Sequence, residues 1–460
     1  MNNSAVAGLC RLRFHTPGAA FELAVPADVP LADLLPAVLG HAPGDLAEQG
    51  LDHGGWVLQR LGGEPLDEEQ TADGLELRDG DTLYLRPRRA ALPPVHFDDL
   101  VDGVASGVRE RGDGWRPELT HHVAVAAAVL ALAGGLALLA LPGPAGPRAI
   151  GAAATAVLLL LGAASAARAM ADTGAGIALG SAAVPFLGLA ALLVPGGPGG
   201  HELLGARVLA AGSAAAGAGV LAVAAVGAGA PVFLGLVLVA LLVAVAGGLL
   251  IGGLAVDQVA AVLSVLAVLA GAFVPSTAFR LSGLRLPALP RNAEELQEGI
   301  EPFPAEGVLA RSLIADDYLM GLYSAVGAVT AACLVLLATG RGWGGPGQAG
   351  ALSLLLLLHS RAIGSIRQRL VLLLPGLGGA ALLVARVTPG HPPQARLLVL
   401  GGLLVAVLAL LVAAWTVPGR RLLPYWGRLA DLLHTLSAVA LVPLALLVCG
   451  VYHAMRAMNG

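Results

Sequence analysis

The chain has 460 residues, of which 57% are hydrophobic and only 13% are charged, and its mean hydropathy is +0.79. So few charges cannot cover the surface of a water-soluble protein of this length, and the composition therefore indicates an integral membrane protein. All 27 residues of the lysine-plus-arginine class are arginine, which excludes a P-loop ATPase and a pyridoxal phosphate Schiff base because both need a lysine amine.

Charge divides the sequence into two parts. Residues 1–122 hold 20 acidic residues and 10 arginines, a net charge of -10, whereas residues 123–460 hold 11 and 17, a net charge of +6. The first long apolar run begins at Val123, so we expect a soluble part that precedes the membrane and no cleavable signal peptide. Cys10, Cys333 and Cys449 are far apart and are interpreted as small buried hydrophobic residues rather than as metal ligands or disulfide partners.

The soluble part shows strand, helix and turn signals in a compact order. Residues 9–16 and 21–26 alternate apolar and polar on either side of Pro17-Gly18, which predicts a hairpin. Residues 31–42 have helical spacing, and Pro36 is expected to shorten or distort that helix. Short strands are predicted at 55–61, 64–66 and 81–88. The predicted order is therefore ββαβββ.

That order, together with TADGLELRDGDTLYLRP at 71–87, resembles ubiquitin-like β-grasp domains. A conjugated modifier would end in a free Gly-Gly tail, whereas this chain continues to residue 460. We therefore expect residues 1–92 to form a cytosolic α+β docking domain.

Residues 93–122 form a linker with a short amphipathic segment. It is interpreted either as a solvated connecting helix or as a helix that rests on the membrane or on a partner. Arginines 109, 111 and 116 and Trp115, just before the first span, favour the second alternative. The apolar face consists of Phe97, Leu100, Val101, Val104 and Val108.

The remainder, residues 123–460, is predicted to be an α-helical polytopic membrane domain. A spanning helix needs about 20 apolar residues, and on this criterion we count about eleven transmembrane helices. The eighth, with 14 residues, is the weakest, and the eighth and ninth are alternatively a re-entrant pair. The spans are 123–141, 149–167, 176–194, 208–228, 232–253, 259–279, 319–339, 347–360, 370–387, 397–417 and 429–452.

Arginine placement predicts the orientation. With a cytoplasmic N-terminus, the inside segments carry seventeen arginines and the outside segments carry six, namely residues 148, 207, 341, 386, 396 and 456. This asymmetry follows the positive-inside rule, and with eleven spans the C-terminus is extracytoplasmic.

One cytoplasmic loop, residues 280–317, is much longer than the others. It is interpreted either as a solvated acidic loop or as a docking surface for a basic cytosolic partner. Its acidic residues are Glu294, Glu295, Glu298, Glu301 and Glu306.

The spans carry no pattern that indicates catalysis or metal binding. Acidic residues and the histidines 359, 434 and 453 lie near span ends rather than at the midplane, and neither HExxH nor GxSxG occurs. His121 and His122 are interpreted as interfacial residues at the mouth of the first span. We therefore predict no catalytic residues, no metal and no cofactor.

Small residues within the spans are the remaining candidates. Gly176 and Gly180, and Gly248 and Gly252, have GxxxG spacing, which lets helices approach closely. The spacing fits packing within one bundle or a dimer interface, and both alternatives stay open.

The whole arrangement resembles EccD, the multispanning core component of type VII (ESX) secretion systems in actinobacteria. The most specific stretches are GWVLQRLGGEPLDEEQTADGLELRDGDTLYLRPR at 55–88 and RSLIADDYLMGL at 311–322. The resemblance implies a non-enzymatic scaffold that dimerises in the bacterial plasma membrane among its lipids. It also implies an FtsK/SpoIIIE-type ATPase partner (EccC) near the ubiquitin-like domain, an EccB partner and, in mycobacterial-type systems, EccE, with no nucleic acid.

The alternative is a secondary transporter or permease with a regulatory β-grasp domain. It would need midplane ionisable groups and an internal repeat, and the sequence shows neither. A membrane-embedded lipid-modifying enzyme would need metal-ligand spacing, which the acidic loop after the sixth span lacks.

Overall fold

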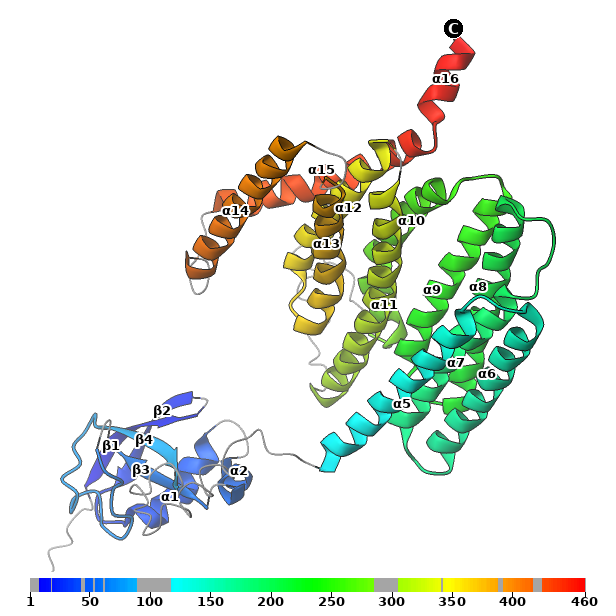
Figure 1. Ribbon diagram of the computed structural model, residues 1–460. Coiled ribbons are helices and arrows are strands. Elements are labelled where there is room, and N and C mark those ends of the chain that lie inside the picture. Colours follow the sequence, from blue (N-terminus) through cyan, green and yellow to red (C-terminus); the bar gives the residue numbers. More distant parts are fainter. Residues whose placement is uncertain are drawn as a thin grey trace, which may run out of the picture. The chain divides into compact units, whose positions relative to one another are not determined.

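The structure is a computed structural model that describes residues 8–17, 19–42, 46–52, 54–60, 63–88, 117–284, 305–340, 342–387, 392–416 and 424–459. The chain divides into two compact units, Met1–Trp115 and Arg116–Gly460 (Figure 1). Each unit has its own hydrophobic core. The predicted amphipathic linker segment, residues 97–108, lies outside the described residues.

The first unit contains a four-stranded sheet in the order β2-β1-β4-β3. The hairpin of β1 (Leu9–Thr16) and β2 (Ala19–Pro26) is antiparallel, β1 pairs in parallel with β4 (Thr82–Pro87), and β3 (Trp56–Gln59) pairs antiparallel with β4. A parallel pair needs a crossover, and the helices of this unit occur in the segment between the hairpin and β3. This mixed sheet confirms the predicted ubiquitin-like fold.

Alternation along the strands places one apolar row beneath the sheet. Leu12, Phe14 and Leu83 are at most 1% exposed, and Val38 of α1 (Leu31–His41) packs against them as part of one cluster. Burying such a side chain stabilises the fold by about 1.5–3 kcal/mol relative to leaving it in water. Trp56 is buried as well, and its indole Nε1 donates a hydrogen bond of 2.7 Å to the carbonyl oxygen of Leu46.

Two local predictions for this unit differ from the structure. Pro36 was expected to shorten or distort α1, and it does not shorten the helix, which continues past Pro36 to His41. Residues 64–66 do not form a strand, since Pro65 makes only an isolated bridge with Gln59 and has no N–H to extend a ladder. The segment predicted as a loop after α1 also contains a second helix, α2 (Leu46–Asp52).

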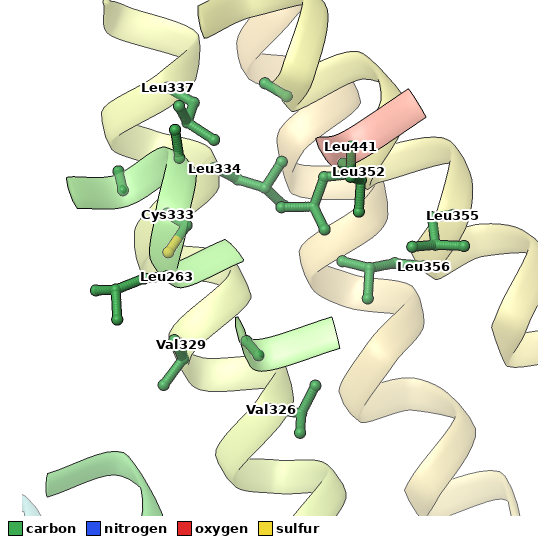
Figure 2. Close-up of a cluster of buried hydrophobic side chains, with 14 of the residues drawn as sticks. Leu263, Val326, Val329, Cys333, Leu334, Leu337, Leu352, Leu355, Leu356 and Leu441 are labelled. Atoms are coloured by element: carbon green, nitrogen blue, oxygen red, sulfur yellow. The ribbon is translucent and has the colours of Figure 1, made fainter. Parts of the chain in front are cut away.

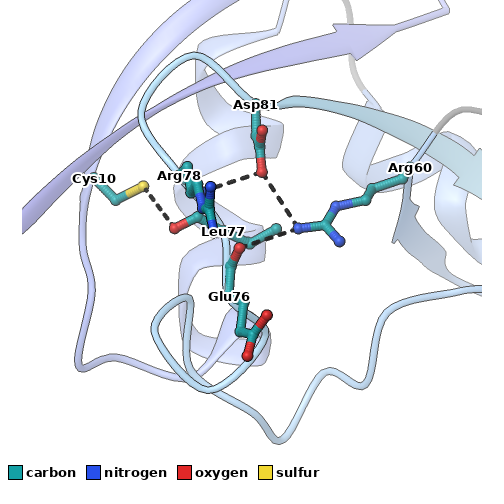
Figure 3. A network of polar contacts seen from close by, with 6 residues as sticks. All are labelled: Cys10, Arg60, Glu76, Leu77, Arg78 and Asp81. Atoms are coloured by element: carbon teal, nitrogen blue, oxygen red, sulfur yellow. Dashed lines mark hydrogen bonds and ion pairs between the residues drawn. The ribbon is translucent and has the colours of Figure 1, made fainter.

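The turn before β4 is fastened by a polar network (Figure 3). Arg60 donates to the carbonyl oxygen of Glu76 at 3.2 Å and to the Asp81 carboxylate at 3.3 Å, and that carboxylate also accepts from the backbone N–H of Arg78 at 3.1 Å. The Cys10 thiol contacts the Leu77 carbonyl oxygen at 3.7 Å. Burial raises the pKa of Cys10, with a further contribution from nearby carboxylates, so this thiol is a packing residue.

The second unit consists of helices α5 to α16, drawn in cyan through red in Figure 1. Each of the eleven predicted spans overlaps one of the helices α5 to α15. The bounds are α5 Pro117–Ala140, α6 Ala145–Arg168, α7 Thr173–Leu192, α8 His201–Val226, α9 Ala230–Ile251, α10 Val256–Leu281, α11 Ala305–Thr339, α12 Gly344–His359, α13 Ile366–Val387, α14 Pro393–Thr416, α15 Pro424–Val448 and α16 Val451–Asn459.

Ten helices of the described part are long and apolar enough to cross a membrane. The helix at the remaining predicted span, α12, has only 16 residues and is not among these ten. At 1.5 Å per residue it is about 24 Å long, somewhat less than the roughly 30 Å hydrocarbon core. The count by length is therefore ten rather than eleven, and the difference falls on the span that the sequence marked as weakest.

Contacts along α11 and α13 show that these two helices run in the same direction. Near their starts, Gln368 donates to the Asp316 carboxylate at 2.6 Å, and at their ends Arg386 donates to the Ala338 carbonyl oxygen at 2.8 Å. The intervening α12 runs antiparallel to α13, because Gly350 lies beside Leu383 whereas Leu357 lies beside Gly376. The short helix α12, followed by the 3-10 turn Ser360–Ala362, thus returns the chain from one end of the bundle to the other.

The same reasoning applies to α15. It runs antiparallel to α12, since Arg361 just beyond α12 pairs with Asp431 near the start of α15, and Gly344 at the start of α12 lies beside Val448. Helices α11, α13 and α15 therefore run in the same direction, and α12 runs in the opposite one.

The largest core of the bundle joins α10, α11, α12 and α15 (Figure 2). Leu334, Leu337 and Leu352 are at most 1% exposed and belong to one cluster with Leu441 of α15. Cys333 is 2% exposed in the same cluster, as expected for a small apolar side chain.

Helix α11 extends into the segment that was predicted as the long loop. It begins at Ala305, so 14 residues of helix precede the predicted start of the seventh span at Leu319. Four of the five acidic residues of that loop, Glu294, Glu295, Glu298 and Glu301, lie outside the described residues. Glu306 lies in the first turn of α11.

Candidate functional site

The predicted glycine pairs have different environments. A Cβ added at Gly176 would lie 3.1 Å from the Ala163 carbonyl oxygen of α6, and one at Gly180 would lie 3.0 Å from the Phe233 ring of α9. These two glycines therefore permit close packing inside the bundle. Gly248 has no atom within 4 Å of such a Cβ, and Gly252 meets only backbone of its own helix, so this pair faces away from the bundle.

The tightest helix contact involves glycines outside the two GxxxG pairs. Gly205, Gly212 and Gly219 recur every seven residues along α8 and face α9. A Cβ at Gly205 would approach the Ile251 backbone nitrogen to 2.7 Å and the Gly247 carbonyl oxygen to 2.9 Å. The two backbones are in direct contact, and the heptad spacing is the signal that could have identified the pair.

The stretch RSLIADDYLMGL also has an observable structural role. Arg311 donates to the carbonyl oxygen of Gly283, just beyond the end of α10, at 3.2 Å, Asp316 accepts from Gln368 of α13, and Gly321 meets the backbone of Pro231 in α9. About three turns of α11 thus contact three neighbouring helices or their ends. The residues that carry the family resemblance are positions where α11 is anchored.

Arginines near the predicted outer ends of helices bind backbone carbonyls. Arg386 donates to the carbonyl oxygens of Ala338, Gly340 and Gly342 at 2.8, 2.6 and 3.1 Å, which satisfies orphan acceptors at the end of α11. Arg148 makes three similar contacts with the end of α5 and the turn that follows. These cations are held by helix C-termini, where the macrodipole favours positive charge.

Polar groups inside the bundle are uncharged. Among the described residues, every polar side chain in the buried class is Ser, Thr or Gln. Gln348 of α12 is fully buried and donates to the Ala261 carbonyl oxygen at 3.0 Å and to the Ser264 hydroxyl at 2.9 Å, which ties α12 to α10. Such bonds between helices contribute on average about 0.6 kcal/mol in a membrane protein.

His121, one of the two histidines at the mouth of α5, has a structural contact. Its Nε2 lies 3.4 Å from the Asp172 carboxylate, and Asp172 also caps α7 by accepting from the Ala175 N–H at 2.9 Å. No group of three potential metal-ligating side chains occurs within the described ranges. His121 therefore joins the start of α5 to the turn between α6 and α7.

His359 and His434 form a pair that the sequence reading set aside. Their rings, from the end of α12 and the early part of α15, stack with centroids 5.5 Å apart, and Tyr323 lies 6.3 Å from His359. They are about 75 residues apart in sequence and belong to different helices, so no local motif could have joined them.

Comparison with known proteins gives the family. A profile of the EccD-like transmembrane domain matches residues 120–458, which is most of the chain. The chain belongs to the EccD family. A second profile, that of the YukD protein of the WXG100 protein secretion system, matches residues 9–85, the range of the ubiquitin-like unit.

Individual EccD relatives cover both units. The ESX-4 secretion system protein eccD4 of Mycobacterium tuberculosis, in strains CDC 1551 / Oshkosh and ATCC 25618 / H37Rv, is 29% identical over 98% of this chain and 98% of its own length. These relatives are type VII secretion components, and this chain is accordingly a multi-pass plasma-membrane component of such a system.

Two solved structures have the same fold at 20% sequence identity. Protomer 1 of the ESX-3 core complex aligns with a TM-score of 0.57 over 97% of this chain and all of that chain. The MycP5-free ESX-5 inner membrane complex in State II aligns with a TM-score of 0.55 over 90% of this chain and all of that chain. Both solved chains come from multi-component assemblies, and at this identity the likeness shows that the fold is shared.

Proposed function

We propose that this EccD family member is a non-enzymatic scaffold that organises the membrane core of a type VII secretion complex and docks its cytosolic ATPase. The observation that carries the proposal is the direct backbone contact between membrane helices, at Gly205 and Gly247 for example, in a chain that matches the family over both units. Helices in backbone contact form a rigid frame, because interiors packed at this density do not deform continuously.

A transporter would use the bundle differently. Ion-coupled transport needs charged groups along a path through the membrane, whereas the buried polar side chains of the described residues are neutral and are mostly hydrogen-bonded to helix backbone. The arginines at helix ends bind carbonyl oxygens. These contacts support a static role.

The docking surface that we propose is the acidic connection between β3 and β4. Residues 64–81 contain eight acidic residues and one arginine. Glu64, Glu69 and Asp73 are exposed, whereas Glu68 is held by Arg88 at 2.7 and 2.8 Å. A dense negative surface of this kind favours a basic partner, here an EccC-like ATPase, and acts on association rate and specificity.

A paired charge reversal tests the docking proposal. The double variant Glu64→Arg/Glu69→Arg should recover markedly less ATPase on copurification. High salt screens the same charges, so the wild-type protein in high salt should show a similar loss of ATPase. The control Asp28→Arg/Asp33→Arg changes the net charge equally at exposed positions near α1 and should retain the ATPase. Equal recovery with both variants would contradict this docking surface. Ion-driven solute uptake by the purified protein in liposomes would replace the scaffold with a transporter.

We further propose eleven membrane crossings, with the N-terminus cytoplasmic and the C-terminus outside. The parallel directions of α11, α13 and α15 support a crossing by α12, and the arginine asymmetry supports the orientation. Reporter fusions after Gly460 should be active outside, and fusions at about residue 300 should be active inside. A cytoplasmic signal after Gly460 would exclude an odd number of crossings.

We propose that the open pair Gly248 and Gly252 contacts a second copy of this chain in a homodimer. The other proposed partners in the membrane are EccB-like and, in some systems, EccE-like components. Both glycines are exposed on one side of α9 and its end. Gly248→Cys should form a disulfide-linked dimer in native membranes, and Gly217→Cys, an equally open position on α8, should not. Monomeric Gly248→Cys under oxidising conditions would exclude this face.

A further inference from the structure

A cavity of about 290 Å³ lies between the helices at one end of the bundle. Its walls come from α10, α11, α12, α13 and α15, and apart from Tyr323 and two histidines they are formed by aliphatic residues and one glycine. Tyr323, Leu356 and Leu372, at 6%, 3% and 1% exposure, form the inner wall. Because these side chains are covered by other helices, hydrocarbon that only surrounds the bundle does not reach them.

The outer wall of the cavity opens sideways between α10 and α15. Leu269 of α10 is 53% exposed and Val442 of α15 is 50% exposed, and Ala272 is an exposed wall residue. Both helices qualify as membrane spans, so this opening faces the hydrocarbon of the bilayer. An apolar cavity of this kind excludes water. An alkyl chain of a surrounding lipid can enter it from the bilayer.

The polar end of the cavity is the histidine pair. The stacked rings of His359 and His434 both line it. Neither imidazole makes a hydrogen bond with another group in the part of the chain that the structure describes. Unpaired ring nitrogens beside an apolar cavity are costly unless something satisfies them. Arg361, in the 3-10 turn just beyond α12, and Asp431 of α15 are paired at 2.7 Å next to the histidines and are exposed.

We propose that this cavity binds one acyl chain of a membrane phospholipid, with the ester or phosphate oxygens of that lipid accepting hydrogen bonds from His359 and His434. The apolar walls match the chain, the lateral opening gives access from the bilayer, and the imidazole N–H groups supply the donors that a lipid head region lacks in hydrocarbon. The lipid fills the gap between α10 and α15, two helices whose side chains otherwise leave it open. This site does not depend on the proposed docking of an ATPase.

Photo-crosslinking of the full-length protein tests the site. The protein is reconstituted in nanodiscs with phosphatidylglycerol that carries a diazirine in one acyl chain, and labelled peptides are identified by mass spectrometry. We expect labels on Tyr323 and Leu356 of the inner wall, in addition to the outward-facing residues that any surrounding lipid reaches. Labels confined to outward-facing residues would overturn the proposal.

Matched variants separate the cavity from the general lipid contact. Ala272→Trp places a large ring at the opening and should reduce inner-wall labelling by about tenfold or more, which corresponds to about 1.4 kcal/mol. The control is Ala406→Trp on α14, an exposed position on a helix that does not line the cavity. This variant should leave inner-wall labelling unchanged. Equal labelling in both variants would contradict a cavity entered from the bilayer.

The head-region contact has its own test. His359→Leu/His434→Leu keeps the volume of the site but removes its donors, and should lower inner-wall labelling by the phospholipid probe. A diazirine fatty acid offered at the same concentration distinguishes the source of the chain. Stronger inner-wall labelling by the fatty acid than by the phospholipid, or no effect of the double variant, would overturn the assignment of a phospholipid.

Discussion

Close contact between α8 and α9 makes Gly212 a sensitive position. A Cβ at Gly212 would lie 2.7 Å from the Ala240 carbonyl oxygen and would also meet the backbone of Ala244. Ordinary contact begins at 3.4 Å, so Gly212→Ala forces the helices apart by at least about 0.7 Å, the difference between 3.4 and 2.7 Å, because the Ala244 backbone nitrogen lies closer still. A gap of that size removes about a quarter to a half of each dispersion contact along the interface, and overpacking of this kind costs about 1–3 kcal/mol.

The matched control is Gly217→Ala on the same helix. Gly217 is exposed and has no atom within 4 Å of an added Cβ. Its replacement removes a flexible residue without a clash and should be neutral or should stabilise the helix by up to about 1 kcal/mol. The difference between the two variants isolates the packing cost, because the same methyl group is added in both.

The assay is the apparent melting temperature of the purified membrane protein, followed by size-exclusion chromatography after heating. A change of 1 kcal/mol shifts the midpoint by about 2–4 °C for domains of 150–250 residues. Gly212→Ala should therefore melt several degrees below both the wild type and Gly217→Ala. If Gly212→Ala melts with the wild type, or if Gly217→Ala falls as far, the close backbone contact between α8 and α9 is wrong.

Two further predictions concern single side chains. Leu83 is fully buried beneath the sheet, so Leu83→Asp buries an unpaired charge and should abolish the cooperative thermal transition of a fragment of residues 1–92. The control is Leu51→Asp, at a leucine that is 83% exposed. It should keep the transition and change the free energy of unfolding by no more than about 0.5 kcal/mol. Dispersed amide spectra for Leu83→Asp would refute the β4 assignment. Arg386→Gln removes donors from three carbonyl oxygens and should lower the apparent melting temperature of the bundle, whereas Arg396→Gln at an exposed site should not. Equal melting of these two variants would show that the α11 cap contributes nothing.

The sequence located the ubiquitin-like domain and a helix at each predicted span. Charge segregation between residues 1–122 and 123–460 and the length of the apolar runs are local properties, and they sufficed for this, but not to find α2 and α16 or to show that α12 is too short to count as a span by length. The turn at Asp79-Gly80-Asp81 was also readable, because Gly80 has a φ of +89° that glycine adopts without strain.

Only the tertiary structure decided which faces meet. Membrane helices such as α8 and α9 are apolar on all sides, so hydropathy gives no periodic signal that distinguishes a packing face from a lipid face. For this reason equal GxxxG spacing described both Gly176 and Gly180, which pack inside the bundle, and Gly248 and Gly252, which do not. The direction of the short helix α12 and the meeting of two distant histidines depend on contacts between helices, and these contacts exist only after the bundle has assembled.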